Sequence, residues 1–212
     1  MSKTYFVTGI GTGVGKTLVS TILTEALKAD YYKPIQCGDL DSTDADFVQE
    51  HLFNSRSKVH PTSVLLRLAA SPHAAAMAEG KSLKANQILL PSTTNKLLVE
   101  GAGGVLVPLN ENKEYIIDIA RINNLEIILV VDYYLGSINH TLLTLNYLLS
   151  NNFKIALIVF NGDKVETSKR AILKEAQNIP FVEIDRFDVS PESIKEQADS
   201  LAQSLENLLN VK

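Results

Sequence analysis

The chain has 212 residues, 45% hydrophobic and 21% charged, which is the composition of an ordinary globular protein long enough for one well-buried domain. Its formal net charge of −4 offers no basic surface for nucleic acid, and no apolar run approaches the roughly 20 residues that cross a bilayer. The single cysteine, Cys37, excludes an intrachain disulfide and fits a reducing compartment. Because no apolar leader precedes the first apolar run, we expect one domain over residues 1–212, in the cytoplasm, with neither nucleic acid nor membrane as a partner.

A glycine-rich stretch near the start, TGIGTGVGKTL over residues 8–18, follows an apolar run and precedes residues spaced like one helix face. Glycines let successive backbone N–H groups turn toward a phosphate chain, and the start of a helix adds its positive dipole. Lys16 would reach the β- and γ-phosphates, and the Thr17 hydroxyl would be a Mg²⁺ ligand. The stretch therefore predicts a phosphate-binding loop in preference to a glycine-rich hairpin turn.

The glycine spacing makes this loop a variant. The usual loop has glycine where Ile10 stands, whereas here the glycine comes one residue earlier, at Gly9. No register gives the dinucleotide pattern G-x-G-x-x-G, because Val14 or Lys16 occupies its last position, and a NAD site is therefore disfavoured.

Apolar, strand-like runs alternate with helical patterns along most of the chain. They occupy Tyr5–Thr8, Tyr31–Ile35, Lys96–Glu100, Glu126–Asp132, Ile155–Phe160 and Phe181–Ile184. Near-continuous apolar strands of this kind are typical of a parallel sheet covered on both faces. We therefore expect a three-layer α/β fold of the P-loop NTPase type, with its site at the carboxyl ends of the strands.

Charged residues lie within and just after the second of these runs, Tyr31–Ile35. Lys33 precedes Pro34, which cannot continue freely as a central strand, so Lys33 is expected at the sheet edge, either functional or simply solvated. Next, residues 38–46 hold four acids before a short helix expected near Phe47–Leu52. Most of these acids are expected to be solvated or to cap the helix, but one could bind Mg²⁺.

Two further acids end apolar strands. Glu100 runs into Gly101-Ala102-Gly103-Gly104, where glycines let the backbone approach a ligand, and this makes Glu100 a candidate for a direct or indirect Mg²⁺ contact. Asp132 ends a strand in the same way. Spacing alone leaves the choice between them open, although the glycines favour Glu100.

Helix starts supply the remaining candidates. A helix over residues 72–80 is expected to have Ser71 as its cap, and His73 there is either a substrate contact or a surface residue. Asn139 lies near the start of a helix capped by Ser137, where it could hold a carboxylate or act only in capping.

Three features complete the chain. Residues 161–163, Asn-Gly-Asp, follow a strand and are a candidate contact for a nucleotide base. The last helix is expected from Ser190-Pro191 to about Leu209. The four histidines lack metal-ligand spacing, so zinc is not expected.

Six motifs occur together in one order: VTGIGTGVGKT, YYKPIQCG, SPHAAAMAEG, VEGAGG, LGSINHTLLT and FNGD. This set resembles dethiobiotin synthetase, a family of the biotin pathway, from Phe6 to about Asp163 and only weakly beyond. The resemblance implies an ATP- and Mg²⁺-dependent ring closure. 7,8-Diaminononanoate takes up CO₂ as a carbamate, ATP phosphorylates it, and the second amine displaces phosphate to form a cyclic urea. It also implies a homodimer with the substrate between subunits.

The resemblance also implies a role for individual residues. Lys33 matches the active-site lysine, acting with Lys16 and Thr12, while Thr17, Asp44 and Glu100 match the metal-linked residues, which favours Glu100 over Asp132. Asn139 would receive the substrate carboxylate across the dimer, and Thr12, Lys33 and Cys37 would also contact substrate. The nucleotide would be held by Gly13, Val14, Gly15, Lys16, Thr17, Leu18, Asp44, Glu100, Gly101, Ala102, Gly103, Asn161 and Gly162.

The chain departs from the family pattern at three places. Gly11 replaces a frequent aspartate, and Cys37 replaces a serine or threonine, whose hydroxyl is a stronger hydrogen-bond partner than a thiol. The turn at residues 182–187 lacks a proline that helps hold adenine. Use of triphosphates other than ATP is therefore an open alternative.

Two other functions were weighed. A partitioning or septum-positioning regulatory ATPase would share the fold, but those proteins have a lysine where Ile10 stands here, and the sequence shows no basic or amphipathic terminal anchor. An amide-forming relative from cobalamin synthesis would need a glutaminase domain, for which 212 residues leave no room.

Overall fold

Seven parallel strands form the central sheet of the computed structural model, which describes residues 3–176 and 178–210. The strand order is β4-β2-β6-β1-β7-β8-β9. Their bounds are β1 (Thr4–Gly9), β2 (Asp30–Tyr32), β4 (Val59–His60), β6 (Leu97–Gly104), β7 (Glu126–Asp132), β8 (Ile155–Asn161) and β9 (Phe181–Ile184). Since β1 lies between β6 and β7, the strand that feeds the glycine-rich loop is central in the sheet.

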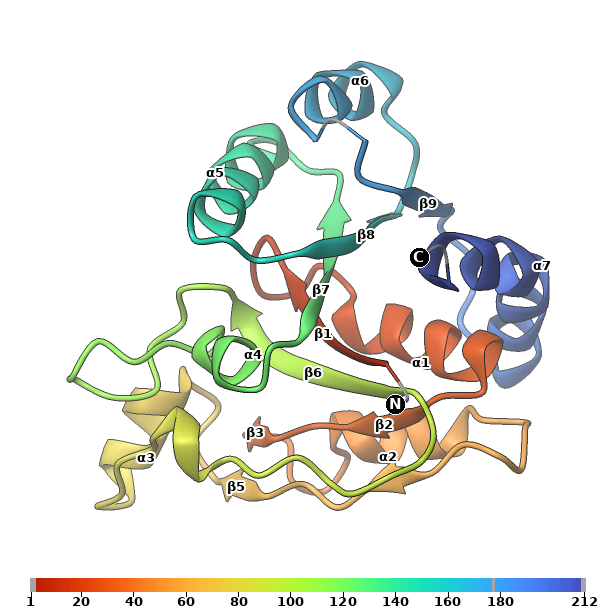
Figure 1. Ribbon diagram of the computed structural model, residues 1–212. Helices are drawn as coiled ribbons and strands as arrows, with labels where there is room; N and C mark the ends of the chain where they lie inside the picture. The colour runs from red at the N-terminus through yellow and green to blue at the C-terminus, as the bar shows by residue number, and fades with distance from the viewer. Residues whose placement is uncertain (1–2, 177, 211–212) are drawn as a thin grey trace.

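Helices cover both faces of this sheet (Figure 1). On one side α1 (Lys16–Leu27) packs against α7 (Pro191–Asn210) and α2 (Asp44–Glu50). On the other side lie α4 (Asp118–Ile122) and α5 (Ser137–Ser150), with α6 (Glu166–Glu175) against α5. The expected three-layer α/β fold is confirmed. No helix in the described part of the chain is both long enough and apolar enough to cross a membrane.

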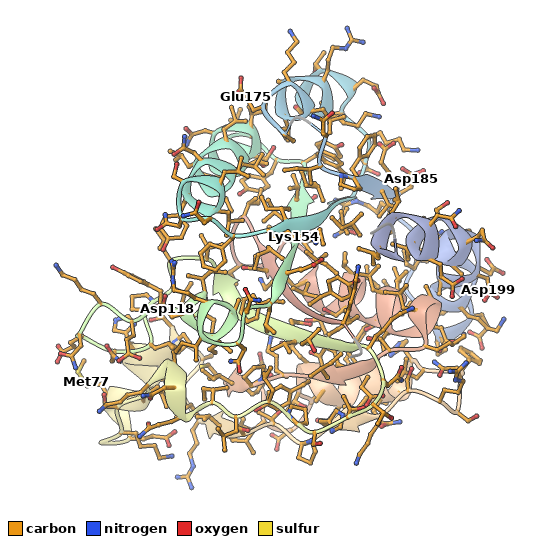
Figure 2. All side chains as sticks on the ribbon, viewed as in Figure 1. Met77, Asp118, Lys154, Glu175, Asp185 and Asp199 are labelled. Carbon is orange, nitrogen blue, oxygen red and sulfur yellow. The ribbon has the colours of Figure 1, made fainter. Side chains whose placement is uncertain are left out.

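The apolar pattern of the strands explains this arrangement. The five residues Ile127–Val131 of β7 are all fully buried, as are Phe6 and Val7 of β1, because both sheet faces are covered. Most charged side chains lie at the surface, as Figure 2 shows for Glu175, Asp185 and Asp199 at the rim of the molecule, whereas a few are buried.

The expected strand over Tyr31–Ile35 is wrong in its extent. The chain leaves the main sheet after Tyr32 and forms β3 (Ile35–Cys37), which pairs with β5 (Val64–Leu66) in a separate two-stranded sheet. Pro34 has no N–H to donate to a ladder, so the strand breaks there. Neither β4 nor β5 was expected, because runs of two or three residues carry no clear periodicity.

The glycines after Glu100 also differ from expectation, since they continue β6 as far as Gly104. A Cβ at Gly101 would lie 2.8 Å from the Phe6 ring, so the absence of a side chain lets β6 pass close to β1.

Helix starts agree with the sequence in two cases and differ in two. Ser71 precedes α3 (Pro72–Ala78), and the Ser190 hydroxyl accepts a hydrogen bond from the Ser193 N–H (3.1 Å) at the start of α7. The helix expected from Phe47 begins earlier, at Asp44, because Thr43 forms a capping box with Asp46. The cap of α5 is Gly136, with φ of +100°, so Ser137 is instead its first helical residue. A short 3₁₀ helix, η1 (Ala85–Gln87), completes the elements.

Candidate active site

The glycine-rich loop joins β1 to α1 at the carboxyl edge of the sheet. Gly13 and Gly15 have φ of +75° and +83°, a region in which side chains are strained. A Cβ at Gly15 would also meet Nδ2 of Asn161, so a side chain there would have to displace the amide that donates to the Val14 carbonyl. The Lys16 ammonium donates a hydrogen bond to the Gly11 carbonyl (3.0 Å) and so folds back over the loop.

A buried charge cluster lies beside the loop. The Lys33 ammonium is 2.8 Å from Oε1 of Glu100 and 2.5 Å from Oδ2 of Asp44. The Thr17 hydroxyl donates to Oε1 of Glu100 (3.1 Å), and the Tyr31 hydroxyl donates to its Oε2 (3.0 Å). The cluster therefore brings α1, β2 and α2, which lie near one another in sequence, together with the distant strand β6 at one edge of the sheet.

Burial and charge set the protonation of this cluster. Burial acts to lower the pKa of Lys33, but Glu100 and Asp44 outweigh it and raise that pKa, so Lys33 is an ammonium. For Lys16 burial prevails over the attraction of Glu100 and lowers the pKa to about 8. Burial, followed by Glu100 and Asp44, raises the pKa of Tyr31 well above its usual value, so Tyr31 stays a hydrogen-bond donor.

A cavity of about 390 Å³ opens onto the cluster. It combines cationic groups that suit phosphate oxygens with carboxylates and a hydroxyl that suit a hard cation. Most of the predicted site residues line it: Thr12, Gly13, Gly15, Lys16, Thr17, Lys33, Cys37, Asp44, Glu100, Ala102 and Gly103.

Other predicted nucleotide contacts lie around this cavity without lining it. Asn161 ends β8, and its Nδ2 donates to the carbonyl of Val14 (3.0 Å), which ties that strand to the loop. Gly162 follows it, and the carbonyl of Gly101 accepts a hydrogen bond from Lys33 (3.3 Å). Leu18 packs against the hydrophobic core from α1.

Asn139 is not brought to this cavity within one chain. It is exposed on α5 and lines a different cavity of about 780 Å³, together with Tyr134 and Leu135. Asp132 also lies outside the charge cluster and accepts a hydrogen bond from the backbone of Tyr133 (2.7 Å). His73 bonds to the Ser71 hydroxyl (3.0 Å) and does not line the loop cavity.

Sequence reasoning missed two polar residues of the site. The sequence predicts Tyr31 only as a strand residue, whereas its hydroxyl donates to Glu100, and Gln36 lines the cavity from β3. The signal for Gln36 was a polar residue in an otherwise apolar run just after Lys33-Pro34. Tyr31 gave no such signal, because tyrosine is common in strands.

The chain resembles known proteins over most of its length. A family model described as an AAA domain matches residues 3–184. Three curated relatives are ATP-dependent dethiobiotin synthetases. That of Cytophaga hutchinsonii is 50% identical over 81% of this chain and 83% of its own length. That of Christiangramia forsetii is 48% identical over 82% of this chain and 83% of its own length. That of Paramagnetospirillum magneticum is 38% identical over 84% of this chain and 89% of its own length.

Solved structures show the same fold at low identity. A ParA family ATPase from Chlorobium tepidum superposes with a TM-score of 0.51 at 16% identity, over all of this chain and 93% of that one. A putative plasmid partition protein from Borrelia burgdorferi, bound to AMPPNP, superposes with a TM-score of 0.56 at 11% identity. This match covers 97% of this chain and 99% of that one. At these identities the likeness concerns the architecture alone.

Proposed function

The chain belongs to the dethiobiotin synthetase family, and we propose that it closes the cyclic urea of dethiobiotin at the cavity beside its phosphate-binding loop. One amine of 7,8-diaminononanoate adds to CO₂ and loses a proton, giving a carbamate. The carbamate oxygen takes the γ-phosphoryl group of ATP, and ADP leaves. The second amine then attacks the carbonyl carbon and loses a proton, phosphate leaves, and a urea remains.

The observation that carries this proposal is the buried Lys33 ammonium between two carboxylates, in the same cavity as Lys16. A carbamate and a transferring phosphoryl group are both anionic, and a fixed ammonium stabilises the charge that moves between them. Lys16 and the loop N–H groups hold the phosphates, and Thr12 contributes a hydroxyl at the cavity wall. The protein therefore acts mainly by positioning and by electrostatic stabilisation.

Thr17, Asp44 and Glu100 are the residues that would hold Mg²⁺. They offer only oxygen ligands, as this hard cation prefers, and the Thr17 and Lys33 donors both converge on one buried Glu100 oxygen. Mg²⁺ bound with few protein ligands takes the rest from phosphates and water, which fits a set of two acids and one hydroxyl. When bound, the ion neutralises phosphate charge.

We also propose a homodimer. Leu106 and Leu143 are 46% and 63% exposed and line an apolar hollow with Ile10 and Tyr147 beside the loop. An exposed apolar surface of this kind supports a contact between copies. It also accounts for Asn139, which reaches no substrate within its own chain but would present its amide to the substrate carboxylate in a second copy.

The nucleotide and the compartment complete the proposal. We place the enzyme in the cytoplasm, consistent with its single, unpaired Cys37. We propose that Asn161 and Gly162, which follow each other at the end of β8 beside the loop, contact the base. The turn at residues 182–187 lacks proline, so the choice of base is a matter for direct test.

The test is an incubation with 7,8-diaminononanoate, bicarbonate, Mg²⁺ and each of ATP, GTP and CTP, measuring phosphate release and the urea by mass. Urea with ATP supports the proposal, and urea with every triphosphate shows relaxed base choice. Slow ATP hydrolysis without any urea would instead favour a regulatory ATPase.

A further inference from the structure

The carboxamide of Gln36 has an unusual environment. Gln36 lies on β3, is only 6% exposed and lines the active-site cavity. Its Nε2 donates to the Gly38 carbonyl (3.1 Å). Its Oε1 is buried, yet within the described residues it has no hydrogen-bond partner. A buried carbonyl oxygen without a partner is unfavourable and calls for an explanation.

The orientation of this amide follows from its surroundings. If the amide were turned over, Oε1 would face the Gly38 carbonyl, and two acceptors would meet. Gly38 is itself anchored, because its N–H donates a hydrogen bond to the Leu66 carbonyl (2.8 Å). The unpartnered atom is therefore the acceptor oxygen, and its natural partner is a donor.

We propose that Gln36 is a positioning residue whose Oε1 accepts a hydrogen bond from an amino group of the diamine substrate. This rests on the proposed function. Gln36 lines the same cavity as Lys33, so its buried Oε1 lies next to the space in which the reactants would meet, and a rearrangement of the terminal amide on binding would expose it there. Binding then gives the oxygen the partner that it lacks in the free protein.

The chemistry of the reactants favours the amine over the other ligands of the cavity. Phosphate groups and bicarbonate present mainly acceptor oxygens, which a carbonyl oxygen repels. An amino group, charged or neutral, presents N–H donors. Lys33 attracts the anionic carbamate, and Gln36 would hold N–H groups of the same molecule, so the two residues recognise opposite features of the substrate.

The experiment compares wild type with Gln36→Met, which keeps the length of the side chain and removes the acceptor. Calorimetry gives the Kd of diaminononanoate and of ATP, and thermal melting gives the stability of the free protein. We expect the Kd of the diamine to rise about tenfold or more, the Kd of ATP to stay within about twofold, and the melting temperature to hold or rise. Gln49→Met, on the exposed face of α2, is the matched control and should change none of the three.

Two results overturn the proposal. Equal diamine affinity in wild type and variant removes any role for Oε1 in recognition. A lower melting temperature with equal losses of diamine and ATP affinity shows a purely structural residue. If Gln36→Met does not fold, Gln36→Ala, which only deletes atoms, takes its place with the same expectations for the two Kd values. Wild type that binds the diamine and forms the urea upholds the proposed function whatever the variant does, whereas wild type that does neither overturns both proposals.

Discussion

The Lys33 ammonium and the Glu100 carboxylate form an ion pair at 2.8 Å, with side chains that are 5% and 0% exposed. Such a pair is costly to bury unless both partners are fully bonded. Here Glu100 also accepts from Thr17 and Tyr31, and Lys33 also meets Asp44, so the pair is well satisfied. Removing Lys33 takes from the buried Glu100 carboxylate its ion-pair partner, whereas removing Glu100 leaves Lys33 with Asp44 alone.

Replacing Lys33 separates catalysis from nucleotide binding. We expect Lys33→Ala to lower kcat by about 10²–10³-fold while ATP affinity changes little, because the lysine stabilises charge that develops during transfer. Lys16→Ala should lower both kcat and ATP affinity, since Lys16 belongs to the phosphate-binding loop. Single-turnover kinetics and calorimetry measure the two effects. Lys154→Ala, at an exposed lysine with a 70% exposed side chain, is the control, and a fully active Lys33→Ala enzyme would disprove the assigned role.

The lowered pKa of Lys16 predicts a pH dependence of ATP binding. Burial places that pKa at about 8, and phosphate binding favours the ammonium. Below pH 8 the lysine is already charged; above it, ATP binding must draw a proton from solvent, so affinity falls by up to about tenfold per pH unit. Calorimetry at pH 8.5 in buffers of different ionisation enthalpy should detect this proton uptake. Lys16→Arg stays charged and should show none, and equal uptake in both proteins would contradict the assignment.

The contact between Gly15 and Asn161 predicts a compensating pair of substitutions. Gly15→Ala places a Cβ against Nδ2 of Asn161, and we expect ATP affinity to fall more than about tenfold as the loop is displaced. Asn161→Ala removes the obstructing side chain, so the double variant should recover part of that affinity. The φ of +83° at residue 15 keeps recovery incomplete. A double-mutant cycle by calorimetry measures the coupling, and strictly additive losses would show that this contact does not govern the loop.

Asp30 predicts an acid-dependent loss of stability. Although burial acts to raise its pKa, hydrogen bonds from Thr93, His60, Asn95 and the Lys58 backbone prevail and lower it. A carboxyl group with a lowered pKa stabilises the fold above its unfolded pKa of about 4, and that contribution is lost as pH falls through the lower folded pKa.

We therefore expect Asp30→Asn to reduce the unfolding free energy by about 1–3 kcal/mol at pH 7 and to flatten its decline in acid. Urea unfolding between pH 7 and pH 3 measures both effects. Asp199→Asn, on the exposed part of α7, should leave the curve unchanged. If the unfolding free energy of Asp30→Asn fell in acid as steeply as that of the wild type, other carboxyl groups would be responsible for the acid dependence.

The apolar surface around Leu143 predicts the oligomeric state. Leu143→Glu should convert a dimer to a monomer, because a charge at a buried contact is uncompensated. Urea formation should fall with it, since Asn139 of a second copy would no longer reach the substrate, while ATP binding persists. Sedimentation and the urea assay measure these, with Val189→Glu at another exposed apolar residue as the control. A fully active monomer would contradict the shared site.

The sheet and the loop could be predicted from sequence because their signals are local. Long apolar runs identify strands, and Gly-Lys-Thr between a strand and a helix indicates phosphate binding. The break at Pro34 moved β3 into a second sheet, and only tertiary pairing with β5 decides that placement. The support of Glu100 by Tyr31 depends on how two neighbouring strands are paired, which no spacing along the chain encodes. The role proposed for Asn139 requires a second copy, which no pattern along a single chain can reveal.

The strands that pair with β1 determine when a newly synthesised chain can bind nucleotide. The phosphate-binding loop emerges early, but Thr4 pairs with Leu97 and Tyr5 with Glu126, so the strand beneath the loop finds its partners only after much more of the chain has been made. Non-local pairings of this kind slow folding, and a nascent chain that stops before β6 lacks Glu100 altogether. Nucleotide binding should thus appear late and abruptly along the growing chain, once β6 and β7 have been made.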